Sequence, residues 1–188
     1  MFHKRQEHFL FIFCIQTNLQ QLCLVKWYKS SPFHPPTPTM HTLVHYADDP
    51  HRQPVIQLWE TVFGYEAAHN TPSLAIDKKL AMHDGLFFVA LVDGTVVGTV
   101  LAGYDGHRGW LYSVAVHPSQ RKKGLGAALV RLAEQALAAR GCMKINLQIV
   151  SGNEAVTAFY ASLGYAVEKR VSMGKTVGQN IPVAQGLA

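Results

Sequence analysis

Between residues 42 and 177, hydrophobic and polar positions follow a regular pattern that predicts one mixed α/β domain. Runs rich in β-branched and aromatic residues predict strands at 42–46, 86–92, 95–104, 110–116, 144–150, 165–171 and 172–177. Apolar residues at helical spacing predict helices at about 48–63, 71–82, 125–140 and 153–163. Asp93-Gly94 predicts a tight hairpin turn, and Gly164 predicts a left-handed helix end. The expected order is therefore strand, two helices, three strands, helix, strand, helix, strands.

Residues 1–39 do not share this pattern. They combine two early cations, a short apolar run at 9–15, Gln- and Asn-rich sequence and a proline-rich segment at 32–38. A signal peptide is one interpretation, although no small-x-small cleavage site follows the apolar run. The other is a leader or disordered arm, or sequence upstream of a true start at Met40. We therefore expect an arm at 1–39, a folded domain at 40–178 and a C-terminal tail at 179–188.

Composition narrows the class of protein. The 188 residues are 48% hydrophobic and 15% charged, which suits one globular domain with a sizeable core. No apolar run approaches the roughly 18 residues of a membrane span. The net charge is +5, and the arm, with four cations and one acid, carries +3 of it. The nearly balanced domain argues against a nucleic-acid partner, and nothing predicts a membrane partner.

Cysteine and histidine spacing predicts neither a disulfide framework nor a metal site. The three cysteines, Cys14, Cys23 and Cys142, have no metal-like spacing, and a reducing cytoplasm is the simplest compartment for them. The ten histidines form no H-E-x-x-H or H-x-E pattern. We therefore predict a cytoplasmic protein that uses no metal.

A basic loop meets a helix start at 117–127. The loop contains a proline, a serine and three cations, and Gly124 and Gly126 lie where loop becomes helix. The first turn of a helix has unpaired N–H groups and partial positive charge, and glycine lets an anion approach them closely. This predicts a phosphate site, best suited to a pyrophosphate, and its residues are Arg121, Lys122, Lys123, Gly124, Leu125, Gly126 and Ala127. Neither the Walker pattern nor the dinucleotide fingerprint GxGxxG is present.

The pattern R-x-x-G-x-G at 121–126, behind a strand ending V-x-V-H-P, resembles the GNAT superfamily of acetyl-CoA-dependent N-acetyltransferases. The hexapeptide alone also fits a solvated basic loop. The longer runs GTVLAGYDGHRGWLYSVAVHP and FYASLGYAVE extend the resemblance over about 42–177, and they are most similar to the YpeA-type branch. The resemblance implies an α/β fold of the mixed-sheet α+β type, in which two parallel central strands, 111–116 and 145–150, splay apart.

The resemblance also implies how acetyl-CoA is held. The pyrophosphate of coenzyme A binds the basic loop, and pantetheine inserts between the splayed strands against the backbone of Val114, Ala115 and Val116. The same strand offers an N–H near the thioester carbonyl. Asn153, a helix cap by its position, contacts the pantetheine arm in such enzymes, and Tyr160 points at the coenzyme sulfur as the general acid. The alternative for Tyr160 is packing in the core, although a buried phenol favours a hydrogen-bond partner.

The expected reaction is transfer of the acetyl group to a primary amine by direct attack in a ternary complex. Gln148 stands where relatives that acetylate protein N-termini often carry a glutamate, and it cannot take a proton. Asp105, His107 and Glu60 remain as candidate bases, each with a structural alternative in a turn or on a solvated helix face. A non-catalytic acetyl-CoA sensor is the competing function. The acceptor, a small molecule or a protein amino group, stays open, as does the choice between monomer and homodimer.

Overall fold

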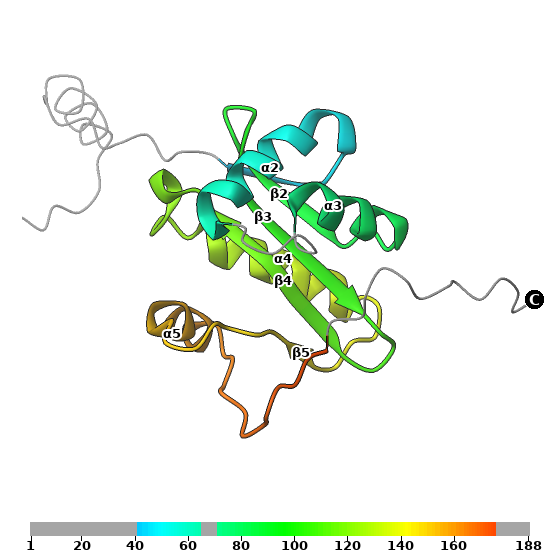
Figure 1. Cartoon of the computed structure of the whole chain (residues 1–188), viewed down its shortest axis with the longest axis vertical. Coiled ribbons are helices and arrows are strands. Elements are labelled where there is room, and N and C mark those ends of the chain that lie inside the picture. Colours follow the sequence, from blue (N-terminus) through cyan, green and yellow to red (C-terminus); the bar gives the residue numbers. More distant parts are fainter. Residues whose placement is uncertain (1–40, 65–70, 176–188) are drawn as a thin grey trace, which may run out of the picture. The chain divides into compact units, whose positions relative to one another are not determined.

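The computed structural model describes residues 41–64 and 71–175 of the chain (Figure 1). Its helices and strands, in order, are β1 (His41–His45), α2 (Asp48–Phe63), α3 (Pro72–Ala81), β2 (Phe87–Val92), β3 (Thr95–Tyr104), β4 (Gly109–Val116), α4 (Leu125–Ala138), β5 (Ile145–Asn146) and α5 (Glu154–Ser162), with a short 3-10 turn, η2 (Pro118–Gln120), between β4 and α4. None of the helices within these ranges is long and apolar enough to cross a bilayer. The predicted arm and tail lie outside the described residues.

The five strands form one mixed sheet in the order β1-β2-β3-β4-β5. The first three pairings are antiparallel and the last, between β4 and β5, is parallel. Asp93 and Gly94 join β2 to β3 with φ values of 50° and 75°, as a tight hairpin turn of the predicted kind requires. The predicted mixed α/β fold is therefore confirmed.

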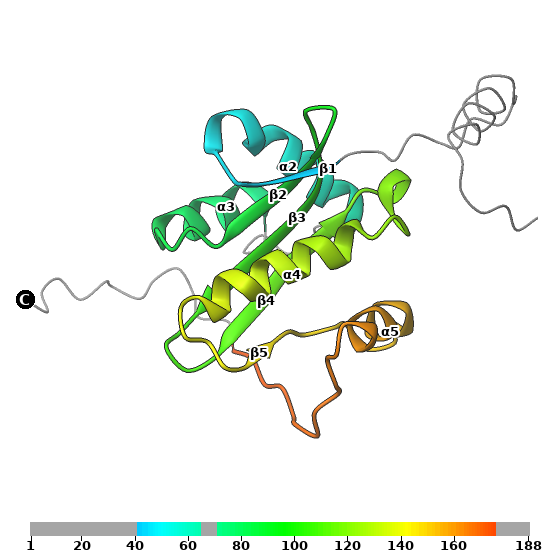
Figure 2. The same cartoon turned by 180° about the vertical axis from the view of Figure 1, so that it is seen from behind.

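Helices cover both faces of β2 and β3. On one face, Phe88, Ala90 and Val100 form a core with Leu129 and Ala133 of α4, which Figure 2 shows crossing the sheet. On the other face, alternate strand residues form a second core with α2 and α3 (Figure 1); its members include Phe87, Val89, Leu101, Trp59 and Ile76. These strands are apolar at successive positions because both of their faces are buried.

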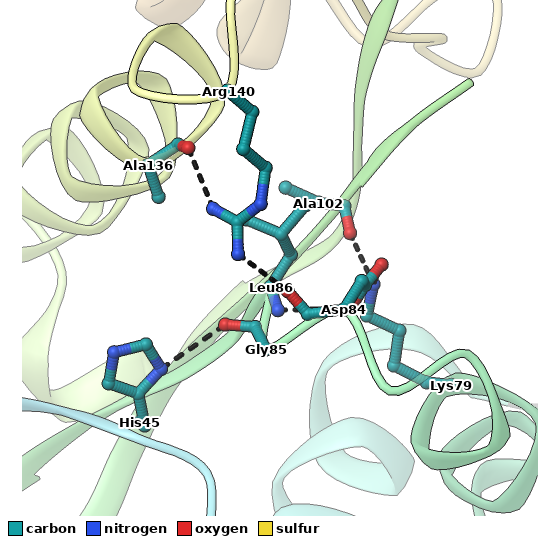
Figure 3. Close-up of polar contacts among 8 residues, drawn as sticks. All are labelled: His45, Lys79, Asp84, Gly85, Leu86, Ala102, Ala136 and Arg140. Carbon is teal, nitrogen blue, oxygen red and sulfur yellow. Dashed lines mark hydrogen bonds and ion pairs between the residues drawn. The ribbon is translucent and has the colours of Figure 1, made fainter. Parts of the chain in front are cut away.

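A buried lysine ties α3 to the sheet. Lys79, 5% exposed, places Nζ 2.6 Å from Asp84 Oδ2 and also donates to the carbonyl of Ala102 in β3. Arg140, after α4, donates to the Asp84 carbonyl at 2.6 Å (Figure 3). Burial lowers the pKa of Lys79, while the Asp84 carboxylate opposes that shift. This cluster joins three segments that are far apart in the sequence.

The strands predicted after α4 are shorter than expected or do not form. The predicted strand at 144–150 is reduced to Ile145–Asn146, and residues 165–175 contain no strand. Val167, Val171 and Met173, which lie in the predicted strands, are 85%, 89% and 93% exposed. A strand needs a neighbouring backbone to satisfy its N–H and C=O groups, and the described residues provide none here. Residues 176–177 of the last predicted strand lie outside the described ranges.

Candidate active site

The two parallel strands separate soon after they pair. Only Gly109 with Ile145 and Trp110 with Asn146 are partners, and the chain beyond β5 leaves β4 on its way to α5 (Figure 1). Within the described ranges, β4 from Leu111 onward therefore has no strand partner on this side. Its other edge stays paired with β3, where Ala115 faces Thr99 and Val116 faces Gly98. An extended ligand that carries amide groups can hydrogen-bond such a free edge as an added strand would.

Strand β4 contains a bulge in its middle. Ser113 and Val114 together oppose Val100 of β3, because the register shifts between the pairs Thr99–Ala115 and Leu101–Tyr112. Ser113 has φ +47°, in the left-handed region that non-glycine residues seldom adopt. Bulges redirect backbone groups and are common beside active sites. No sequence pattern pointed to this bulge, because a serine rather than a glycine occupies the left-handed position.

The basic loop lies at the far end of β4. Arg121 donates from Nε to the Val116 carbonyl at 3.1 Å, and Lys123 donates to the Gln120 side chain at 3.0 Å. Arg121, Lys122 and Lys123 are all exposed. They precede a 14-residue helix, α4, whose first turn contains no acidic residue. The predicted cations thus meet a helix N-terminus, a combination that attracts a multiply charged anion.

The two glycines of the loop have different surroundings. Gly124 is the N-cap of α4 with φ +80°, and an added Cβ would meet no atom within 4 Å. An added Cβ at Gly126 would lie 3.3 Å from Phe159 Cζ and 3.7 Å from Val116 Cγ2. Gly126 therefore allows α4 and α5 to pack closely, which the sequence-based explanation by anion approach did not include. Leu125, between them, is 3% exposed and anchors the first turn in the core, and Ala127 is partly buried.

Helix α5 presents the predicted cap and the predicted acid. Asn153 Oδ1 accepts from Val156 N at 3.2 Å, so the predicted cap is confirmed. Tyr160 is 7% exposed, with its ring 5.0 Å from that of Phe159 and 5.5 Å from that of Tyr165. No described residue hydrogen-bonds its hydroxyl, and burial raises the pKa of Tyr160 to about 12. This phenol is therefore protonated at neutral pH and free to donate to a ligand.

Comparison with known proteins decides the family. The model of the family described as "Acetyltransferase (GNAT) family" matches residues 52–165, well over half of the chain. The chain belongs to the GNAT acetyltransferase family. An acetyltransferase of Yersinia pestis (strain Pestoides F) is 42% identical over 121 residues, which cover 64% of this chain and 85% of that protein. The GNAT family and the acyltransferase class that the sequence predicted are thereby confirmed.

Solved GNAT structures share the fold at low identity. The aminoglycoside N-acetyltransferase AAC(6')-Iy in complex with CoA superposes with a TM-score of 0.62 and 19% identity, covering 75% of this chain and 97% of that one. The ribosomal-protein-S18-alanine N-acetyltransferase of Escherichia coli superposes with a TM-score of 0.55 and 22% identity, covering 66% of this chain and 77% of that one. Proteins of this fold therefore act on chemically different acceptors.

Among the candidate bases of this GNAT chain, Asp105 has a structural role, and Glu60 and His107 show no role in the described structure. Asp105 accepts from the backbone N of His107 at 2.8 Å and of Arg108 at 2.6 Å, and these bonds lower its pKa. Asp105 therefore stabilises a turn, which is the structural role that the sequence offered as the alternative to a catalytic base. Glu60 and His107 are exposed, and within the described ranges no hydrogen bond joins any of the three to Tyr160. Gln148 donates to Ser172 Oγ at 2.6 Å.

Metal ligands do not gather in the described part of the chain. Neither 41–64 nor 71–175 contributes to a group of three or more His, Cys, Asp or Glu side chains that could hold an ion. The predicted mechanism relies on none.

Proposed function

We propose that this GNAT chain transfers the acetyl group of acetyl-CoA to a primary amine that attacks directly in a ternary complex. The observation that carries the proposal is the free edge of β4, which ends at the exposed basic N-terminus of α4. One end of this path suits an extended chain of amides, and the other suits a pyrophosphate. Acetyl-CoA has both parts in that order, and the solved aminoglycoside N-acetyltransferase of this fold holds CoA.

Different residues bind the different parts of acetyl-CoA. Arg121, Lys122 and Lys123 face the pyrophosphate together with the first-turn N–H groups of α4, from residues 124–127. The backbone of Val114, Ala115 and Val116 takes the pantetheine amides. Asn153 uses Oδ1 for its cap, so its amide nitrogen is the atom that can contact pantetheine.

The chemistry is acyl transfer without a covalent enzyme intermediate. The amine nitrogen bonds to the thioester carbon, the C–S bond breaks, and the electron pair leaves with the coenzyme sulfur. The Val114 N–H at the bulge polarises the carbonyl, where negative charge develops. Holding both reactants in this geometry can supply roughly 7–11 kcal/mol of the barrier reduction.

Tyr160 assists the leaving sulfur as a hydrogen-bond donor. A thiol has a pKa near 8.5, so a phenol with a pKa of about 12 holds its proton more tightly than the thiolate would. Donation to the developing thiolate is favourable, while complete transfer of the proton is uphill. The amine's proton leaves through water, because Gln148 cannot accept it, Asp105 accepts two hydrogen bonds within its turn, and no described hydrogen bond joins the exposed Glu60 or His107 to Tyr160.

A non-catalytic acetyl-CoA sensor is the second candidate. The missing base favours it, since Gln148 stands at the position of the expected glutamate. Tyr160 favours the enzyme, because a sensor has no need for a buried phenol without a protein partner.

Further details of the proposal rest on the sequence alone. The long shared runs support the YpeA-type branch, the hydrophobic pattern supports domain boundaries at 40 and 178, and the cysteine usage supports a cytoplasmic location. The choice between monomer and homodimer stays open. The acceptor is an amine on a small molecule or on a protein.

A thiol-release assay tests the function. The full chain is incubated with acetyl-CoA and a panel of amines that includes amino acids, polyamines, aminoglycosides and N-terminal peptides, and free CoA thiol is measured over time. Release that depends on one amine class supports the enzyme. CoA binding in calorimetry without amine-dependent release would identify the sensor instead.

A further inference from the structure

We propose that Trp59 and Thr99 are positioning residues for acyl transfer, which fix the direction of the Val114 N–H through the carbonyl of Ser113. The inference rests on the proposed function and adds two residues to it that lie in the core of the fold. Neither is expected to touch the substrate.

The three residues form one continuous hydrogen-bonded chain. Trp59 Nε1, on α2, donates to Thr99 Oγ1 on β3 at 2.8 Å. The Thr99 hydroxyl donates to the Ser113 carbonyl on β4 at 2.9 Å. Trp59 and Thr99 are both 0% exposed, so water cannot replace either bond. We call this chain the Trp59–Thr99–Ser113 relay.

Thr99 stands out by its position. Its neighbours on β3 from Val96 to Leu101 are apolar or glycine, and both faces of the strand are buried. A buried hydroxyl is costly unless it is fully bonded, and here one proton and one lone pair are used by the relay. Packing alone would be satisfied by valine, which has the same shape. The presence of the Thr99 hydroxyl is therefore explained by its hydrogen bond to the bulged peptide of β4.

The relay holds the bulged peptide in one orientation. Ser113 has φ +47°, a conformation that costs about 1–2 kcal/mol for a residue with a Cβ. The Thr99 hydroxyl donates a hydrogen bond to this displaced carbonyl, which offsets part of that cost. Strained backbone that the surrounding structure holds in place is a known feature of functional sites.

The orientation of Ser113 sets that of Val114. In a trans peptide, the carbonyl of one residue and the N–H of the next point in opposite directions. The Ser113 carbonyl points at Thr99, on the β3 side of β4, so the Val114 N–H points away from β3. That is the side on which β4 has no strand partner within the described residues. The relay thus directs the proposed carbonyl-polarising donor into the proposed thioester site.

A pair of variants at residue 99 isolates the hydroxyl. Thr99→Val keeps the side-chain shape and removes both relay bonds, and Thr99→Ser keeps the hydroxyl and removes only a methyl group. Acetyl transfer to the best amine of the thiol-release panel is measured at saturating acetyl-CoA, with full-length protein well below its melting temperature. Removing an oxyanion donor costs about 10²–10³-fold in kcat, and misdirecting one is expected to cost at least about tenfold.

The expected result separates turnover from binding. Thr99→Val lowers kcat at least about tenfold, while the Kd of CoA, which has no acetyl carbonyl, changes less than about twofold. Thr99→Ser stays within about threefold of the unmodified chain. Val96→Ala is the matched control, because Val96 is buried on the same strand and in the same core as Trp59 but pairs with Leu91 of β2, away from the bulge. It lowers the melting temperature and leaves kcat unchanged.

Two results would overturn the inference. One is a Thr99→Val enzyme that turns over as fast as Val96→Ala, and the other is a Thr99→Ser enzyme as slow as Thr99→Val. If Thr99→Val does not fold, Trp59→Phe replaces it, since it removes only the first bond and a several-fold loss of kcat is still expected. Full activity of Trp59→Phe would then contradict the relay. An unmodified chain that binds no CoA and releases no thiol would instead refute the proposed function, and the inference with it.

Discussion

Strands β2 and β3 differ from β4 and β5 in how completely they are packed against helices and hydrogen-bonded to each other. The first pair is covered by helices on both faces and hydrogen-bonded along its length. The second pair shares two partner positions and then diverges. A co-substrate that binds as an added strand needs an unpaired edge, and such an edge presents backbone N–H and C=O groups that have no partner in the sheet. We call β2 and β3, with the helices that cover them, the closed side of the sheet, and β4 and β5 the open side. The closed side supports the open side.

The two halves also differ in their ion pairs. On the closed side, Lys79 and Asp84 form a pair whose lysine side chain is 3% exposed. On the open side, Lys144 and Glu168 form a pair whose side chains are 44% and 36% exposed. Burial removes competing water, so the first pair is costly to break and the second is not. The following substitutions test this contrast and the site between the two halves.

Gly124→Val should have the largest effect, on co-substrate affinity. Valine is strained at φ +80°, so the chain must change conformation at the start of α4, where each first-turn N–H group can give a charge-assisted bond of about 1.5–3 kcal/mol. We expect the Kd of CoA, measured by calorimetry, to rise about 10³-fold. Gly94→Val is the control, since it places the same residue at φ +75° in a distant turn. Equal loss of CoA affinity in both variants would show a general folding defect.

Lys79→Met should have the next largest effect, on stability. Removing one partner of a buried pair leaves the other charge uncompensated, at a cost of about 3 kcal/mol for a pair whose carboxylate is partly exposed. Urea unfolding should show this loss, while the Kd of CoA for the folded protein is unchanged. Lys78→Met, one residue earlier on the exposed face of α3, should be neutral. A stability of Lys79→Met equal to that of Lys78→Met would contradict the anchoring role.

Tyr160→Phe should lower turnover. The phenol stabilises the leaving thiolate only in the transition state, so we expect kcat to fall about 10²-fold with CoA affinity unchanged. Tyr165→Phe is the matched control, because the Tyr165 hydroxyl is also partly buried but donates to Glu134 at 2.8 Å. It should cost stability and little activity. Loss of CoA binding in Tyr160→Phe, with normal turnover of the bound fraction, would make Tyr160 a packing residue.

Lys144→Met should have the smallest effect. An exposed ion pair contributes about 0–1 kcal/mol, so the free energy of unfolding should change by less than about 1 kcal/mol. Urea unfolding beside Lys79→Met measures the contrast directly. Equal losses in the two variants would mean that the open side is anchored as firmly as the closed side.

Local rules explain which features the sequence predicted. The cap at Asn153 and the left-handed Gly164 depend on residues a few positions away, so their sequence patterns suffice. The Asp93-Gly94 hairpin is equally local. The predicted phosphate site rests on the same kind of information, since its cations and glycines are contiguous from 121 to 126.

Non-local pairing explains what the sequence did not predict. Residues 165–175 were predicted to form strands, but a local pattern does not provide a neighbouring strand, and within the described residues none pairs with them. Trp59 and Thr99 are 40 residues apart, and each fits an ordinary core position when taken alone. The Gly126 contact with Phe159 likewise depends on the packing of α5 on α4. A threonine within the apolar run of β3 was the one local sign of the relay.

The central claim is that the free edge of β4 and the start of α4 form an acetyl-CoA site, and titration of the full chain with CoA and with acetyl-CoA in a calorimeter tests it most directly. The account predicts one site per chain, with affinities for the two ligands within about threefold, because the contacts are to the pyrophosphate and the pantetheine rather than to the acetyl group. Absence of heat with both ligands, from a chain that unfolds cooperatively, would contradict it.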